Sequence, residues 1–277
     1  MKSIVNLNPE LGGLSLSENK LVLKTVEDKH AILTINRPKA MNIIDNEVLE
    51  ELFAHLQELN QDEKVKCVII TGSGEKAFIG GANVKAMKEM DPVEAKQFSQ
   101  IGQEVLNFME STMSKPVIAA INGHALGGGL EVAMAADIRV ASENAKLGAP
   151  EINLGIIPGY GGTYRLPQIV GAGKAKELIY TGKLIDAQEA EQIDLVDKVT
   201  SQEELMNTVR ELAQKITSKS LRTLNFAKEA VNMGLQEPSD KAVQYERNVF
   251  SLCFATEDQK EGMSAFLEKR DPEFVDR

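Results

Sequence analysis

The sequence has no tryptophan, only two cysteines and three histidines, and aromatic residues make up 5% of its 277 positions. Cys67 and Cys253 both lie among apolar neighbours, so we expect two buried free thiols and no disulfide framework. The chain has neither an HExxH sequence nor the Cys and His spacing of a zinc site. We therefore predict that it holds no metal ion.

Long apolar runs and excess basic charge are also missing. No stretch of about 18 apolar residues is present, and residues 1–20 lack the basic and apolar regions of a secretory signal. Lys and Arg total 31 against 41 Asp and Glu, which gives a net charge of −10 and disfavours a general nucleic-acid binder. We expect a cytoplasmic protein with no membrane or nucleic-acid partner, although local lysines can still hold an anionic ligand.

What is present is an alternation of β-rich and helical segments that becomes mostly helical late in the chain. LVLKTV and AILTIN flank a polar turn and predict a hairpin, while VKCVIITG and KPVIAAING predict buried strands. Asp45 is a candidate N-cap for an amphipathic helix, and a further helical region is expected over Val93–Met113. We predict an N-terminal extension over residues 1–20, an α/β core over 21–200 and a helical region over 201–277.

Two glycine-rich segments each follow a predicted strand and lead into a predicted helix. They read IGGANVKAM at 79–87 and LGGGLEVAM at 126–134. Backbone N–H groups at the start of a helix lack an intrahelical acceptor, and glycine lets a ligand approach them closely. Two such segments facing each other can donate two hydrogen bonds to one oxygen, as in an oxyanion hole. The alternative is that the glycines only permit close strand–helix packing, and their spacing alone does not decide between the two.

Two glutamates lie in unusually apolar, glycine-punctuated surroundings. Glu131 follows the second glycine-rich segment, and Glu151 begins the stretch EINLGIIPGYGG. Carboxyl groups in a low-dielectric environment can be driven to different pKa values, so that one donates a proton and the other accepts one. The pair is separated by two predicted strands, DIRVAS and AKLGAP, which allows them to converge. Two surface or helix N-terminal acids are the alternative interpretation.

Long stretches of the chain resemble the crotonase superfamily, and within it the enoyl-CoA hydratases. The resemblance extends from about Leu21 to Arg277 and is carried by NRPKAMN, KAFIGGANVKAM, KPVIAAINGHALGGGLEVAMAADIRVAS, PEINLGIIPGYGGTYRL and EGMSAFLEKR. It implies an α/β fold, a crotonase-like spiral of ββα repeats that forms two roughly perpendicular sheets. It also implies a C-terminal helical region that builds homotrimers, often paired into hexamers.

The same resemblance implies a reaction and the residues that perform it. Ala82 and Gly128 match the two backbone N–H donors of the oxyanion hole, and Glu131 and Glu151 match the two catalytic acids. Water adds reversibly across a trans-2-enoyl-CoA to give the (S)-3-hydroxyacyl-CoA. Glu131 activates the water that attacks C3, and protonated Glu151 delivers hydrogen to C2. No metal or redox cofactor is implied, because coenzyme A is part of the substrate.

Substrate and CoA contacts carry over less specifically. The matching positions are Lys39, Ala40, Gly80, Asn83, Lys85, Gly127, Phe266 and Lys269. Phe266 and Lys269 are expected to reach the CoA bound by a neighbouring subunit. For each lysine the alternative is a solvated surface charge.

The chain departs from many relatives at a few of these positions. Asn83 stands where Asp is common, and either side chain is expected to hold the turn. Tyr160 and Tyr164 stand where small residues and Gln are common, which leaves the acyl chain length open. His124 invites a catalytic role, but we interpret it as a satisfied histidine at a strand end.

Other functions remain as alternatives. Enoyl-CoA isomerisation and acyl-CoA thioester hydrolysis use the same scaffold, but the presence of both glutamates favours hydration. A non-catalytic or RNA-binding relative is expected to lack a glutamate or to carry a strong basic patch, and this sequence shows neither.

Overall fold

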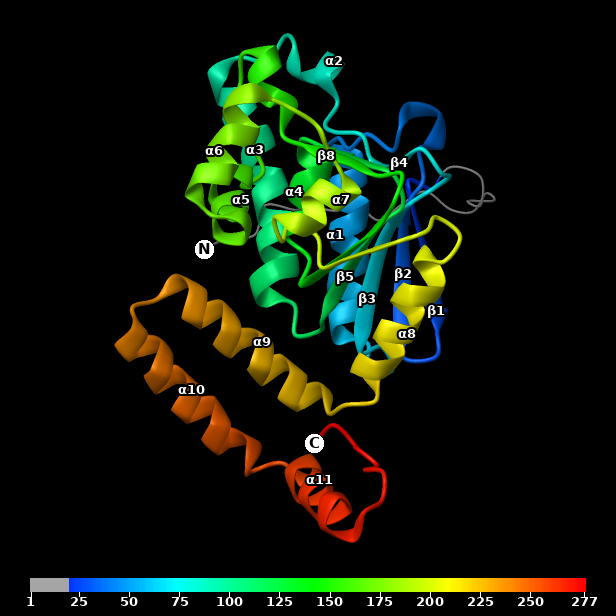
Figure 1. Ribbon diagram of the computed structural model, residues 1–277, viewed down its shortest axis with the longest axis vertical. Coiled ribbons are helices and arrows are strands. Elements are labelled where there is room, and N and C mark those ends of the chain that lie inside the picture. Colours follow the sequence, from blue (N-terminus) through cyan, green and yellow to red (C-terminus); the bar gives the residue numbers. More distant parts are fainter. Residues whose placement is uncertain (1–19) are drawn as a thin grey trace, which may run out of the picture.

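The computed structural model describes residues 20–277, so the predicted N-terminal extension lies outside the described residues except for Lys20. Two β-sheets form the core of the α/β region (Figure 1). The larger sheet has the order β1-β2-β3-β5-β7-β10, with β1 (Val22–Glu27), β2 (His30–Ile35), β3 (Cys67–Gly72), β5 (Val117–Ile121), β7 (Ile138–Ser142) and β10 (Lys198–Thr200). The smaller sheet has the order β4-β6-β8-β9, with β4 (Ala77–Ile79), β6 (His124–Leu126), β8 (Lys146–Gly148) and β9 (Ile185–Asp186).

From β3 to β8, successive strands alternate between the two sheets. β3, β5 and β7 pair in parallel in the larger sheet, and the strands that follow them, β4, β6 and β8, pair in parallel in the smaller one. Each strand pair leads into helical structure, so a strand–strand–helix unit recurs along the chain. β1 and β2 form the predicted antiparallel hairpin, in which Val22 pairs with Ile35.

Helical segments cover both faces of the larger sheet and extend beyond it. They are η1 (Pro38–Ala40), α1 (Asn46–Gln61), α2 (Val84–Met87), α3 (Pro92–Asn107), η2 (Phe108–Thr112), α4 (Gly128–Met134), η3 (Pro150–Leu154), α5 (Gly162–Val170), α6 (Ala172–Thr181), α7 (Ala187–Gln192), α8 (Leu205–Thr217), α9 (Leu221–Gln236), α10 (Ser239–Cys253) and α11 (Glu257–Glu268). Every residue of β3 and β5 is buried, as expected for parallel strands with both faces covered.

The amphipathic pattern of the sequence places α1 on the sheet. Its buried stripe consists of Val48, Leu49, Leu52, Leu56 and Leu59. Asp45 caps the helix as predicted, because its side chain accepts a hydrogen bond from the Val48 N–H. The helix expected over residues 93–113 is divided, since α3 ends at Asn107 and the chain continues as the π-helical turn η2.

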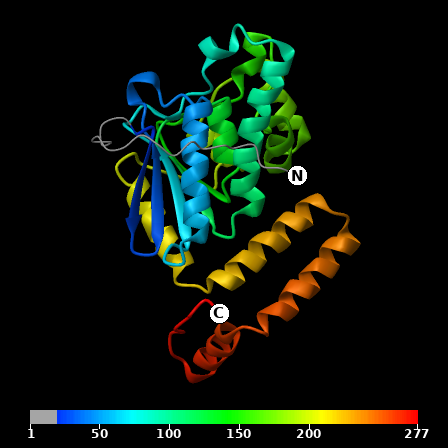
Figure 2. The same ribbon diagram turned by 180° about the vertical axis from the view of Figure 1, so that it is seen from behind.

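The last three helices lie away from the sheets. α8 still packs on the larger sheet, where Leu205, Val209 and Ala213 complete a buried cluster. α9 and α10 then form a pair that projects from the core, with α11 at the far end, as Figures 1 and 2 show from opposite sides. Lys228 ties α9 to the core by donating to Asp137 Oδ2 at 2.9 Å. Between residues 20 and 277, no helix combines the length and apolar character needed to cross a membrane.

Candidate active site

A pocket of about 970 Å³ opens between α2 and α3 on one side and the η3–α5 segment on the other. Its lining includes the backbone of Ala82 and Gly128 and the side chains of Glu131 and Glu151. These are the four residues that were predicted from the sequence to form the oxyanion hole and to act as catalytic acids. Apolar side chains from α2, α3 and the residues after η3 form much of the remaining wall.

The pairing of β4 with β6 brings the two glycine-rich segments together. These strands are parallel neighbours in the smaller sheet, so the chain leaves both at the same edge. Ala82 lies in the segment after β4, and Gly128 is the first residue of α4 after β6. Hydrogen bonds of the described backbone use the N–H groups of Asn83 and Gly127 and leave those of Ala82 and Gly128 without an acceptor there. Two residues that line the pocket therefore have backbone N–H groups without an acceptor in the described part of the chain.

Both interpretations of the glycine run apply, at different positions. A Cβ atom at Gly129 would lie 2.0 Å from the Ile79 carbonyl oxygen, so this glycine permits close strand–helix packing. Gly127 has φ +53°, a conformation that disfavours other residues, and a Cβ there would lie 2.9 Å from Glu151 Oε1. Gly127 therefore makes room for the carboxyl group of Glu151.

Glu131 is the more constrained of the two acids. It lies on α4 with 3% of its surface exposed, and its Oε1 accepts hydrogen bonds from the N–H groups of Tyr160 at 2.8 Å and Gly162 at 2.7 Å. Its pKa is raised to about 7, mainly by burial and also by the nearby Glu151 charge. The bond from Gly162, and to a lesser extent that from Tyr160, acts in the opposite direction by stabilising the carboxylate.

Glu151 has fewer partners. It lies in η3 rather than directly at a strand end, and 9% of its surface is exposed. Its Oε2 atom is buried without a hydrogen-bond partner among the described residues. Burial raises the pKa of its carboxyl group, which favours the protonated form. Glu131 is thus held by two backbone N–H groups, whereas Glu151 has a carboxyl oxygen without a hydrogen-bond partner among the described residues.

The other positions implied for substrate binding fall into two groups. Gly80, Asn83 and Gly127 lie in the segments that frame the pocket. Asn83 caps α2, because its side chain accepts from the Ala86 N–H, and a Cβ at Gly80 would lie 2.9 Å from Met41. These residues shape the backbone around the pocket.

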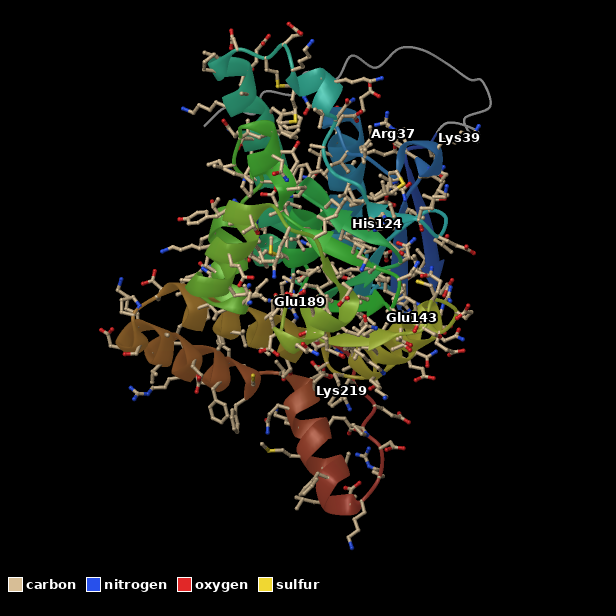
Figure 3. The ribbon with its side chains drawn as sticks, turned by 45° about the horizontal axis from the view of Figure 1, so that its top comes forward. Arg37, Lys39, His124, Glu143, Glu189 and Lys219 are labelled. Atoms are coloured by element: carbon tan, nitrogen blue, oxygen red, sulfur yellow. The ribbon has the colours of Figure 1, made fainter. Side chains whose placement is uncertain are left out.

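The charged positions lie on the surface. Lys39 and Ala40 are exposed on η1, where Figure 3 shows Lys39 close to Arg37. Lys85 is exposed on α2 and does not line the pocket. Phe266 and Lys269 lie at the end of α11, which Figure 1 shows at the opposite end of the molecule from α2. A single chain does not bring these two residues to the pocket.

The structure adds detail on four residues of the site region, of which only Tyr160 was considered in the sequence. Lys88 and Lys96 line the pocket, and the spacing of Lys88 three residues after Lys85 was a usable signal. Tyr160 fills the space beside Gly128, with its ring about 3.3 Å from where a Cβ would stand. Arg165 lies behind the loop that holds Glu131 and was not recognisable from the sequence.

His124 begins β6 near the middle of the molecule (Figure 3) and does not line the pocket. The expectation of a satisfied histidine is wrong in one respect, because Nδ1 is buried and has no hydrogen-bond partner among the described residues.

Comparison with known proteins identifies the family of this chain. A family model described as enoyl-CoA hydratase/isomerase matches residues 26–277. A crotonyl-CoA hydratase of Syntrophomonas wolfei is 49% identical over 251 residues, which are 91% of this chain and 96% of that protein. A short-chain-enoyl-CoA hydratase of Clostridium acetobutylicum is 48% identical over 252 residues, with the same two coverages.

Solved structures give the same result for the fold. The crystal structure of an enoyl-CoA hydratase from Bacillus anthracis superimposes with a TM-score of 0.90 at 38% identity, covering 93% of this chain and all of that one. An enoyl-CoA hydratase subunit from Geobacillus kaustophilus gives a TM-score of 0.89 at 38% identity, covering 94% of this chain and all of the other. The predicted crotonase-like α/β fold is confirmed.

Proposed function

The chain belongs to the enoyl-CoA hydratase/isomerase family, and we propose that it adds water reversibly across a trans-2-enoyl-CoA to give the (S)-3-hydroxyacyl-CoA. It is a hydro-lyase in this proposal. The observation that carries it is the meeting of two buried carboxyl groups and two unused backbone donors in one pocket. Hydration of a conjugated thioester needs these two elements, because charge develops on the carbonyl oxygen while one proton leaves the attacking water and another is delivered to C2.

The thioester oxygen accepts hydrogen bonds from the N–H groups of Ala82 and Gly128. As water attacks C3, negative charge moves through C2 to this oxygen, and the two fixed donors stabilise the enolate-like transition state. Loss of one such donor typically costs about 10²–10³ in rate. Because both donors belong to the backbone, their direction is set by the β4–β6 pairing and the start of α4.

Glu131 removes a proton from the attacking water, and Glu151 supplies the proton that C2 receives. The roles follow from the two environments, since Glu131 has two amide N–H groups to stabilise its anion while Glu151 has an oxygen without a partner. The pKa of about 7 for Glu131 suits a general base at neutral pH. The two carboxyl groups titrate as a coupled pair, and the roles reverse in dehydration.

Short acyl chains are the proposed substrate class, with crotonyl-CoA as the reference. The names of the relatives from Syntrophomonas wolfei and Clostridium acetobutylicum support this choice. Tyr160 supports it independently, because its buried ring packs against Phe98 at a centroid distance of 5.2 Å and occupies space beside Gly128. A longer acyl chain would need that space.

The nucleotide end of the substrate is proposed to meet Lys39, Ala40 and Lys85 at the surface. Phe266 and Lys269 contribute from the α11 of a neighbouring subunit, which explains their distance from the pocket of their own chain. The reaction as proposed uses no metal or redox cofactor, since the two glutamates carry both protons. A cytoplasmic location is proposed because the two cysteines are unpaired, which suits a reducing compartment.

We also propose that the chain assembles as a homotrimer or as a hexamer of paired trimers. α9 has no buried residue, and its Val231 and Leu235 are exposed, as are Phe250 of α10 and Phe266 of α11. Apolar side chains gathered on projecting helices mark an association surface. Sedimentation of the purified protein tests this, with a monomer contradicting the proposal.

The activity test uses crotonyl-CoA and follows the loss of ultraviolet absorbance of the conjugated thioester. Consumption with formation of 3-hydroxybutyryl-CoA is the expected result. An enzyme that leaves crotonyl-CoA unchanged but converts a 3-enoyl-CoA to the 2-enoyl isomer would instead be an isomerase, and release of free CoA would indicate a hydrolase.

A further inference from the structure

Arg165 is a buried cation on the far side of the loop that holds Glu131. It lies on α5 with 2% of its surface exposed. Its Nη1 donates to the Tyr160 carbonyl oxygen at 2.8 Å. Its Nη2 donates to Asn107 Oδ1 at 2.8 Å, and Nε and Nη2 both reach Glu110 Oε2, at 3.1 and 2.8 Å. The guanidinium therefore joins the end of α3, the π-helical turn η2 and the loop before α5.

Tyr160, in the loop before α5, connects Arg165 to Glu131. Tyr160 receives the Arg165 hydrogen bond at its carbonyl and donates its own N–H to Glu131 Oε1 at 2.8 Å. Gly162 donates the second N–H at 2.7 Å. Between them, Gly161 has φ +102°, and a Cβ there would lie 2.3 Å from Arg165 Nη1. The guanidinium thus occupies the place of a side chain at residue 161 and fixes the path of the loop.

Arg165 also acts on Glu131 through its charge. Burial dominates and raises the pKa of the Glu131 carboxyl, whereas the Arg165 charge lowers it. The phenol of Tyr160 and the carboxyl group of Glu151 are the other titratable groups near it, and burial raises the pKa of each. The charged and titratable groups that face Glu131 or share its pocket are Arg165, Glu151, Tyr160, Lys88 and Lys96.

We propose that Arg165 is a positioning residue for Glu131, which it aligns through the Tyr160 peptide without touching the substrate. Glu110 weakens the effect of the Arg165 charge on Glu131, because its carboxylate forms an ion pair with the guanidinium and neutralises part of that charge. The inference rests on the proposed role of Glu131 in hydration. It adds that the base is tuned by an ion pair lying outside the pocket, since neither Arg165 nor Glu110 is among the pocket residues.

Two substitutions separate this role from simple structural support, because they break the same ion pair from opposite sides. Arg165→Gln removes the positive charge, so the Glu131 pKa and the acid limb of the kcat profile should move to higher pH. Glu110→Gln leaves the guanidinium uncompensated, so the limb should move to lower pH. Each shift is expected to be roughly 0.5–1 pH unit, below the 1–3 units typical of a directly paired charge.

The effect on rate should also be selective. Arg165→Gln should lower kcat on the order of 10- to 100-fold through misplacement of Glu131, with KM for crotonyl-CoA changed by less than about threefold. Arg165→Lys keeps the charge but cannot reach all three partners, so it should restore the position of the limb while recovering only part of kcat. Lys174→Gln, which removes a cation from an exposed ion pair on α6, is the matched control and should leave the profile unchanged.

A readout independent of turnover distinguishes this inference from the proposed function. The Glu131 carboxyl carbon, assigned by the signal lost in Glu131→Gln, is titrated by carbon-13 NMR in protein labelled at glutamate. Opposite shifts in Arg165→Gln and Glu110→Gln support the inference even if the wild type fails to hydrate crotonyl-CoA, a result that would sink only the proposed function. Unchanged titration in a folded Glu110→Gln variant, or shifts of the same sign in both, overturns it.

Discussion

Gly127 and Glu151 are in such close contact that a single added methyl group would separate them. A Cβ atom at Gly127 would lie 2.9 Å from Oε1 and 3.4 Å from the carboxyl carbon of Glu151. The glycine also has a positive φ of 53°. The position of Glu151, the proposed proton donor, therefore depends on the absence of a side chain at residue 127.

Gly127→Ala should reduce kcat on the order of 100-fold, because a displacement of about 1 Å at a reacting group has that effect. Gly173→Ala is the control. Gly173 lies within α6, and a Cβ there would meet nothing within 4 Å, so this change should leave kcat intact and stabilise the helix by up to about 1 kcal/mol. Steady-state kinetics and thermal melts of both variants make the comparison. Equal activity of the two variants would contradict the role given to Gly127.

Glu131→Gln and Glu151→Gln should each reduce hydration of crotonyl-CoA by at least about 10²-fold, since each removes one proton-transfer step. Binding of butyryl-CoA, a saturated ester that cannot react, should remain within severalfold of wild type by calorimetry. Loss of binding in parallel with activity would instead indicate that the carboxyl groups shape the pocket.

Glu131→Gln should also make the protein more stable at alkaline pH. Burial raises the Glu131 pKa from its ordinary 4.5 to about 7, so the folded state holds a proton that the unfolded chain releases between these values. Stability from this group is present below about pH 4.5 and is lost as the pH rises to about 7.

Since glutamine stays neutral throughout, the variant should gain on the order of 1–3 kcal/mol over wild type at pH 8 and little at pH 5. Chemical denaturation at both pH values gives this difference directly. A wild-type protein that is as stable as the variant at pH 8 would mean that the carboxylate is fully compensated in the folded state.

Tyr160 provides a test of acyl chain length. Its hydroxyl is buried without a partner in the described part of the chain, so Tyr160→Phe should retain near-normal activity. Tyr160→Ala opens a cavity beside Gly128 and Phe98, at a cost of roughly 3–5 kcal/mol in stability, and should raise kcat/KM for octenoyl-CoA relative to crotonyl-CoA.

Tyr164→Ala is the matched control, because this neighbouring tyrosine is exposed and does not line the pocket. Its ratio of activities on the two substrates should equal that of the wild type. An unchanged ratio in Tyr160→Ala would place the end of the acyl pocket elsewhere.

Local pattern was sufficient for many individual elements. The hydrophobic spacing of α1, its Asp45 cap, the β1–β2 hairpin and the buried strand β3 all follow from patterns within a short segment. The two glycine-rich segments were also recognisable, and the parallel pairing of β4 with β6 explains why the same device appears twice. The spiral architecture itself came from resemblance.

Contacts between residues far apart in the chain could not be predicted from local sequence patterns. The Arg165 contact with Glu110 spans 55 residues, and the N–H of Gly162 reaches Glu131 across 31. Such contacts depend on where the chain turns, which neither periodicity nor composition specifies. The division of the helix after Asn107 was missed for a similar reason, because α3 and η2 have one continuous helical pattern in the sequence.

The first turn of α4 carries both Gly128 and Glu131, three residues apart. A rigid helical turn fixes the spacing between the amide proposed to bind the carbonyl oxygen and the acid proposed to activate water. An insertion or deletion between the two residues would therefore break that spacing. A different reaction on this scaffold is therefore easier to obtain by substituting the side chain at residue 131 or 151 than by relocating the backbone N–H groups proposed to bind the thioester oxygen.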